Sequence, residues 1–130
     1  MISVAWHPSG ESIFTGGTDS TIRRWEIKTG ACPVVMKTQF KIDVIIWTLS
    51  VFSDSTVISG DSLGNTQFWD GEIGVMLSSF KRHEADVLTV TANESLGIAF
   101  STGVDSQIAY FQLVNDNVSY LYYVYILTLL

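Results

Sequence analysis

Three residues of this chain, His83, Ser101 and Asp105, have the types of a nucleophilic hydrolase triad. In such a triad the histidine takes the proton of the attacking serine, and the aspartate orients the imidazole. The sequence around Ser101 lacks the G-x-S-x-G turn that exposes a nucleophilic serine, and it indicates no donors for an oxyanion. We therefore expect no catalytic residues here. The structural interpretation is that these polar groups satisfy one another and hold turns in place.

Metal and cofactor sites have equally little support in the sequence. One cysteine, Cys32, and two histidines are too few for a structural zinc site, and a single cysteine forms no intrachain disulfide. The chain contains no Walker loop, no G-x-G-x-x-G and no EF-hand loop. We predict no metal, no cofactor and no small-molecule substrate.

The charge balance argues against direct binding of nucleic acid. Seven basic residues stand against thirteen acidic ones, for a formal net charge of −6, so the chain is not steered toward phosphates. The basic clusters, Arg23-Arg24 and 81–83, are not interleaved with exposed-looking aromatics as a single-strand binding platform would be. We expect any contact with RNA to be mostly indirect.

An internal repeat organises the chain. Three twelve-residue segments can be stacked, and their first residues are 15, 59 and 101, which gives spacings of 44 and 42 residues. Each segment has a small hydroxyl residue, a Gly- or Asp-rich turn, a β-type run and an aromatic residue at the eleventh place. The segments are TGGTDSTIRRWE, SGDSLGNTQFWD and STGVDSQIAYFQ, and their aromatics are Trp25, Trp69 and Phe111.

Short β-type runs and turns before and after each segment extend the repeat to four strands. No useful window has helical periodicity. The pattern predicts an all-β fold, a partial β-propeller of about three four-stranded antiparallel blades, at about 1–37, 44–80 and 87–113. We expect the last blade to lack a regular outer strand. The alternative is a β-sandwich with coincidental spacing, which agrees less well because period, turns and aromatics coincide.

Two runs carry a more specific resemblance. WHPSGESIFTGGTDSTIRRWEIKTG resembles a repeat of the cirhin family of WD40 proteins, and IIWTLSVFSDSTVISGDSLGNTQFWDGEIG resembles the next repeat more closely. The second run has Trp47 ahead of an F-S-D turn and an I-S-x-D-S-x-G-x-x-Q-F-W-D core at 58–70. The match continues in A-D-V-x-x-V at 85–90 and in F-Q-L at 111–113, so that it covers roughly residues 2–114.

The resemblance implies a function that spacing and charge do not show. Cirhin-like proteins are nucleolar WD40 subunits of the small-subunit processome, which supports maturation of 18S ribosomal RNA. A scaffold in the nucleus and nucleolus is therefore expected, with protein subunits of a large ribonucleoprotein complex as partners and no membrane. The alternative is a WD40 adaptor of another complex, such as a ubiquitin-ligase substrate receptor or a trafficking subunit.

The resemblance also implies a hydrogen-bond relay of His, Ser or Thr, Asp and Trp within each blade. We expect every relay here to be incomplete. In the third blade Phe111 lacks the indole N–H, and in the first the expected histidine position would precede Met1. In the second, Leu63 stands at the Asp position and no histidine precedes the blade. The expected structural relay residues are Thr15, Asp19, Trp25, Ser59, Trp69, His83, Ser101 and Asp105. Arg24, where a typical blade has Val or Leu, is expected to pair with an acid of a neighbouring blade.

The chain is expected to be a piece of a larger protein, because three blades do not close a propeller. We divide it into a WD40 repeat region at 1–114 and an apolar tail at 115–130 outside the repeats. The tail run VSYLYYVYILTLL has no turn residues and, at thirteen residues, is shorter than the roughly 20 that a membrane-spanning helix needs.

Overall fold

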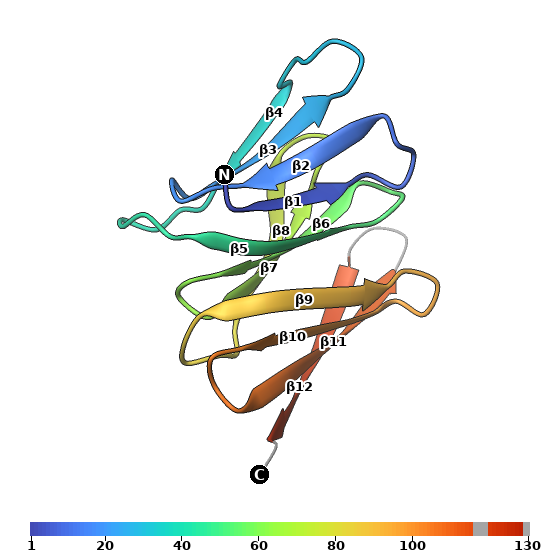
Figure 1. The fold of residues 1–130 in the computed structure, drawn as a ribbon. Helices are drawn as coiled ribbons and strands as arrows, with labels where there is room; N and C mark the ends of the chain where they lie inside the picture. Colours follow the sequence, from blue (N-terminus) through green and yellow to red (C-terminus); the bar gives the residue numbers. More distant parts are fainter. Residues whose placement is uncertain (116–119, 129–130) are drawn as a thin grey trace.

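The structure is a computed structural model that describes the backbone of residues 1–115 and 120–128 and the side chains of residues 1–113. All of the regular elements in these residues are β-strands, arranged in three four-stranded antiparallel sheets. The sheets follow one another along the chain as stacked, twisted blades, with the first and third blades at opposite ends of the stack (Figure 1). The predicted all-β, partial-propeller fold is confirmed. Within the described residues there is no helix with the length and apolar character needed to cross a membrane.

The first blade is built from neighbouring strands in chain order, each paired antiparallel with the next. Its strands are β1 (Ser3–Trp6), β2 (Ser12–Gly16), β3 (Thr21–Glu26) and β4 (Val34–Lys37). Tight turns between the strands, at His7-Pro8-Ser9-Gly10 and around Asp19, carry the residue types that favour reversal of the chain.

The second blade repeats the same order. Its strands are β5 (Ile46–Val51), β6 (Thr56–Asp61), β7 (Asn65–Asp70) and β8 (Val75–Lys81). It is the central blade, and β6 is buried along its whole length because a sheet covers each of its faces.

The third blade contains a strand that the sequence pattern did not predict. Its strands are β9 (Val87–Asn93), β10 (Ile98–Gly103), β11 (Gln107–Asn115) and β12 (Tyr120–Thr128). The expectation that this blade lacks a regular outer strand is wrong, because β12 pairs with β11 from Tyr120 to Thr128. The physical reason is that β11 would otherwise present an unpaired edge, and the Tyr-, Val- and Ile-rich tail has high strand propensity. The proposed boundary between a repeat region at 1–114 and a tail at 115–130 remains a prediction.

The repeated aromatics occupy equivalent places in the three blades. Trp25, Trp69 and Phe111 are each the fifth residue of the third strand, in β3, β7 and β11. They pair with equivalent residues of the second strand, Ile13, Val57 and Ala99. The common position of the eleventh residue in each repeat is therefore confirmed.

The hydrophobic core lies between consecutive blades rather than inside any one of them. One cluster joins the first and second blades, and another joins the second and third. The buried members of the first are Phe14, Ile22, Met36, Val44, Ile46, Val57 and Trp69. Those of the second are Phe52, Ile58, Phe68, Val87, Val90, Ala99, Ala109 and Phe111. Each sheet thus buries an apolar face only where another blade covers it.

Candidate functional site

The third blade brings His83, Ser101 and Asp105 together. His83 lies between β8 and β9, Ser101 lies in β10, and Asp105 lies in the turn between β10 and β11. The imidazole Nδ1 is 2.8 Å from Asp105 Oδ1, and Nε2 is 2.9 Å from the Ser101 hydroxyl. The three side chains therefore form a continuous hydrogen-bonded line from the entry of the blade, through β10, to the β10–β11 turn.

This geometry resembles that of a catalytic triad, but the side chains of Ser101 and His83 are buried, unlike those of a triad that acts on a substrate. Ser101 is 0% exposed and His83 is 1% exposed, so neither the hydroxyl nor the imidazole faces a site that a substrate could enter. A nucleophilic serine must meet a carbonyl carbon directly. The arrangement can instead tie the chain entering β9 to the β10–β11 turn.

Asp105 anchors that turn through backbone donors as well. The amide of Glu84 donates to Oδ2 at 3.0 Å, and the amide of Gln107 donates to Oδ1 at 3.3 Å. Burial raises the pKa of Asp105, but the hydrogen bonds from His83 and from these amides lower it more, so that it lies below its ordinary value. The carboxylate is thus stabilised in its charged form.

The first blade joins only two of its three expected relay residues. The Trp25 indole Nε1 donates to the Thr15 hydroxyl at 2.9 Å. Asp19 lies apart from this pair and accepts instead from the Thr21 hydroxyl at 2.6 Å and from the Arg23 guanidinium at 3.3 Å. The hydrogen bond from Thr21, ahead of the other contributions, keeps the pKa of Asp19 below its ordinary value. Asp19 therefore orders its own turn without reaching the tryptophan.

The second blade joins Ser59 and Trp69, whose indole Nε1 donates to the serine hydroxyl at 2.9 Å. Both residues are buried. Leu63, at the place expected for an aspartate, provides only its backbone amide, which donates to Asp61 Oδ1 at 2.9 Å. The second blade thus holds its turn with a carboxylate that lies two residues earlier than expected.

Asp61 is a residue that holds the turn of the second blade and that the repeat alignment missed. It is buried, and it accepts from the Asn65 amide at 3.0 Å and from the Asn65 side chain at 3.1 Å. Burial raises the pKa of Asp61 more than these bonds and the Leu63 amide lower it, and the charge of Asp86 raises it further. The sequence signal that could have found it is an Asp followed three residues later by Gly, the pattern of an Asx turn.

Gly64 closes the same turn in the left-handed region, at φ +88°. A Cβ added there would lie 2.1 Å from the carbonyl oxygen of His83, whose amide donates to the Gly64 carbonyl at 3.3 Å. Only glycine allows this close approach. The turn of the second blade is therefore packed directly against the entry to the third.

Two hydrogen bonds between blades were also not predicted from the sequence pattern. The Trp47 indole in β5 donates to Asp86 Oδ2 at 2.7 Å, which joins the second blade to the start of the third. The Thr48 hydroxyl accepts from the Val90 amide at 3.3 Å, which joins β5 to β9. The partners in each pair are about forty residues apart in sequence, so that no local pattern indicates them.

A third link crosses between the first two blades. Arg24 in β3 pairs with Glu72, after β7, at 3.1 Å, so the prediction that Arg24 pairs with an acid of a neighbouring blade is confirmed. The same carboxylate accepts from the Ser55 hydroxyl at 2.6 Å, and Ser55 contacts His7 Nε2 at 3.1 Å. The hydrogen bond from Ser55, followed by that from Arg24, lowers the pKa of Glu72.

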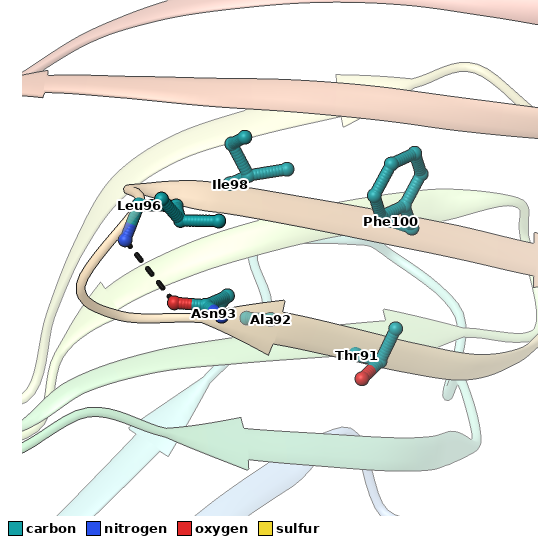
Figure 2. Close-up of a pocket in the computed structure, with 6 residues that line it drawn as sticks. All are labelled: Thr91, Ala92, Asn93, Leu96, Ile98 and Phe100. Atoms are coloured by element: carbon teal, nitrogen blue, oxygen red, sulfur yellow. Dashed lines mark hydrogen bonds between the residues drawn. The ribbon is translucent and has the colours of Figure 1, made fainter.

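Nothing in the described part of the chain gathers three or more His, Cys, Asp or Glu side chains in a group that could hold a metal ion. The surface hollows of these residues differ in character: one is lined by the charged residues Glu11, Arg24, Glu26 and Lys28, and others are mostly apolar. One of about 380 Å³ lies over the β9–β10 hairpin, lined by Thr91, Ala92, Asn93, Leu96, Ile98 and Phe100 (Figure 2).

Comparison with known proteins identifies one of the repeats. Residues 2–26 match the family described as WD domain, G-beta repeat. The solved structure of U3-55K superimposes with a TM-score of 0.79 over 97% of this chain and 38% of that one, at 19% identity, which supports the propeller fold.

Longer relatives support the resemblance drawn from the sequence. The chain is 31% identical over 120 residues to the U3 small nucleolar RNA-associated protein 4 homolog of Homo sapiens. The aligned region covers 88% of this chain and 17% of the human protein. It is also 31% identical over 119 residues to U3 small nucleolar RNA-associated protein 4 of Saccharomyces cerevisiae, covering 85% of this chain and 15% of the yeast protein. The resemblance to cirhin is thereby confirmed. The chain belongs to the WD40-repeat proteins and is similar, over most of its length, to a segment of U3 small nucleolar RNA-associated protein 4.

Proposed function

We propose that the chain is part of a WD40 scaffold for protein assembly in biogenesis of the small ribosomal subunit. The observation that carries the proposal is the 31% identity to the human U3 small nucleolar RNA-associated protein 4 homolog over 88% of the chain. Those relatives take their name from U3 small nucleolar RNA, and the matched segment spans most of this chain. The proposed location is the nucleus and nucleolus, and the proposed process is 18S rRNA maturation.

The proposed partners are protein subunits of a large ribonucleoprotein complex. The basic residues that could neutralise phosphates are partly engaged inside the protein. Arg23 pairs with Asp19, and Arg24 pairs with Glu72. Together with the net charge of −6, this favours protein contacts and only indirect contact with RNA.

The proposed role of the polar residues inside the blades is structural. Ser101 and His83 are buried, and the Thr15–Trp25 and Ser59–Trp69 pairs lie between strands of one sheet. Buried donors and acceptors that satisfy one another keep the turns in a single arrangement. Enzymatic activity forms no part of the proposed function, and the binding surfaces are the rims and loops that these turns present.

The test is affinity capture of the protein encoded by this sequence, tagged at its own locus. The expected partners are U3 small nucleolar RNA, precursor rRNA and small-subunit processome proteins, and the expected location is the nucleolus. Ribonuclease treatment before elution separates protein contacts from RNA contacts, and the protein partners should be retained. Recovery of cullin-type ligase subunits or vesicle-trafficking subunits in their place, with a location outside the nucleolus, would overturn the proposal and favour a different WD40 adaptor.

A further inference from the structure

The connection between the first and second blades is longer than the one between the second and third. Thr38 and His83 are equivalent, because each donates its backbone amide to the carbonyl of the sixth residue of its blade's repeat segment. Ile46 and Val87 are also equivalent, because each pairs with the third residue of its own segment. Eight positions separate Thr38 from Ile46, whereas four separate His83 from Val87. The first connection therefore contains four additional residues.

The additional residues form an exposed tip between two buried ends. Residues 39–43 are all exposed, whereas Thr38 and Val44 are buried. Two residues of the tip are large and apolar, since Phe40 is 39% exposed and Ile42 is 62% exposed. Figure 1 shows this connection, between β4 and β5, reaching out past the ends of the neighbouring strands. The tip thus lies away from the faces of the sheets, and the blades on both sides of it are present.

One residue, Ser20, holds both ends of the connection. Its carbonyl accepts from the Thr38 amide at 3.1 Å, and its hydroxyl accepts from the Val44 amide at 2.7 Å. Its own amide donates to the Val44 carbonyl at 3.1 Å. Ser20 is buried and has φ +67°, in the left-handed region, where the second blade has Gly64. Strain of this kind persists where the surroundings fix the backbone, and it is concentrated at functional sites. The serine adds a hydroxyl that a glycine would lack, and this hydroxyl fixes the second end.

The chemistry of the tip favours a protein partner over RNA. Residues 39–43 read Gln-Phe-Lys-Ile-Asp, with one cation, one anion and no net charge. A single lysine neutralises few phosphates. Aromatic side chains are enriched in protein interfaces, and a loop whose ends are already fixed loses little conformational freedom on binding. Residues added to a repeat also commonly form loops on the binding face of a repeat protein.

We propose that residues 39–43 form a docking loop, pre-set by Ser20, that inserts Phe40 and Ile42 into an apolar pocket of a protein subunit. The exposed Lys41 between them meets a carboxylate at the rim of that pocket. The inference rests on the proposed function, from which protein subunits follow as the partners. It names the part of this chain that one of those subunits contacts.

The docking loop is tested in the full-length protein, tagged at its own locus, with two readouts that must agree. In the first, the photo-crosslinking amino acid p-benzoylphenylalanine replaces Phe40, and the protein crosslinked in cells is identified by mass spectrometry. In the second, affinity capture is repeated with a double variant, Phe40→Ala with Ile42→Ala. This variant should recover at least about tenfold less of the same crosslinked protein, because two apolar side chains no longer leave water on binding.

Two further variants make the test specific. Ile73, 70% exposed in the β7–β8 turn, lies at the opposite end of the strands from the docking loop. Ile73→Ala is the matched control and should recover the crosslinked protein in full. Ser20→Gly keeps a residue that suits the left-handed backbone but removes the hydroxyl, so crosslinking from position 40 should fall about two- to tenfold. Each purified variant should melt at the temperature of the unaltered protein or close to it, which separates lost docking from lost folding.

The outcomes distinguish the docking loop from the proposed function. Crosslinking to RNA, no crosslinked protein, full recovery with the double variant, or unchanged crosslinking in Ser20→Gly would each overturn the docking loop, even where the captured complex is the small-subunit processome. If one protein is both crosslinked and lost but belongs to another complex, the docking loop is supported and the proposed function is wrong.

Discussion

The second and third blades hold equivalent turns with different halves of one hydrogen-bond system. The third blade keeps the turn half, in which His83 bridges Ser101 and Asp105, and has Phe111 where an indole would complete it. The second blade keeps the strand half, Trp69 on Ser59, and has no histidine. Its turn is held instead by Asp61, which accepts hydrogen bonds from the backbone amides of Leu63 and Asn65.

The turn and the strand pair of a blade can therefore be stabilised independently of each other. Each blade leaves its buried hydroxyl satisfied, by an imidazole in one and by an indole in the other. The two carboxylates differ in consequence. Asp105 accepts hydrogen bonds from His83 and two backbone amides and has a lowered pKa, whereas burial and the nearby charge of Asp86 leave Asp61 with a raised pKa.

The largest expected effect comes from the aromatic of the second blade. Trp69→Ala should lower the free energy of unfolding by about 3–5 kcal/mol, because a large buried ring leaves a cavity. For Phe111→Ala the loss in the free energy of unfolding should lie in the same range but be about 1 kcal/mol smaller, because this change leaves no buried hydroxyl without a partner. Urea unfolding at monomeric concentrations measures both.

The control for this pair is Arg23→Ala, at a partly exposed ion pair, which should change the free energy by no more than about 0.5 kcal/mol. Equal losses for Trp69→Ala and Arg23→Ala would contradict the packing of the aromatic between blades.

The next effect comes from the histidine of the third blade. His83→Ala should destabilise the fold by about 1–3 kcal/mol, because the buried Ser101 hydroxyl loses its partner. His7→Ala is the matched control and should cost less than about 1 kcal/mol, since Ser55 keeps its bond to Glu72. Similar losses at both histidines, measured by urea unfolding, would show that burial does not distinguish the two sites.

The pH dependence should run in opposite directions in the two blades. Asp105 has a pKa lowered by folding, so it contributes stability above its unfolded pKa, and this is lost as the pH falls through its folded pKa. Asp61 has a pKa raised by folding, so its favourable contribution is present below the unfolded pKa and is lost as the pH rises through the folded value. Asp105→Asn should therefore cost more at pH 7 than at pH 3, and Asp61→Asn less.

Carbon-detected NMR of the two side-chain carboxyls checks the same point directly. Asp105 should titrate below the ordinary aspartate range and Asp61 above it. Titration of the Asp105 and Asp61 carboxyls at the same pH would contradict the predicted electrostatic difference between the blades.

The smallest expected effect is at the ion pair between the first two blades. Glu72→Gln should cost at most about 1 kcal/mol at low salt and less at 1 M salt, because Glu72 is exposed and its attraction to Arg24 is screened. A loss that does not change with salt would indicate that the bond from Ser55, rather than the charge, supports this junction.

The repeated local features could be predicted from the sequence. Period, turn residues and the eleventh-place aromatic together indicate blade order and the strand that carries Trp25, Trp69 and Phe111. Those signals recur because each blade needs the same turn and the same packing residue. The pairing of Arg24 with a neighbouring acid could also be expected, since a charge on a buried-type strand position needs a partner.

The non-repeated features could not be predicted in this way. Asp61 lies two residues from the aligned position, and the link from Trp47 to Asp86 joins residues that are near only once the blades stack. Strand β12 matches no repeat, so its pairing follows from the open edge of β11 rather than from a motif.

The scaffold role is tested most directly by rescue of the 18S rRNA level in cells depleted of this protein. Ser101→Ala removes the hydroxyl that is hydrogen-bonded to His83, while Trp69→Ala disrupts the blade junction. A scaffold role predicts that Ser101→Ala restores the 18S rRNA level in proportion to the amount of folded protein and leaves the 28S rRNA level unchanged. It predicts that Trp69→Ala lowers the amount of folded protein and does not restore the 18S rRNA level. Normal abundance of Ser101→Ala with no recovery of 18S would contradict a structural role for the buried triad, and recovery of 18S with Trp69→Ala would contradict the blade scaffold itself.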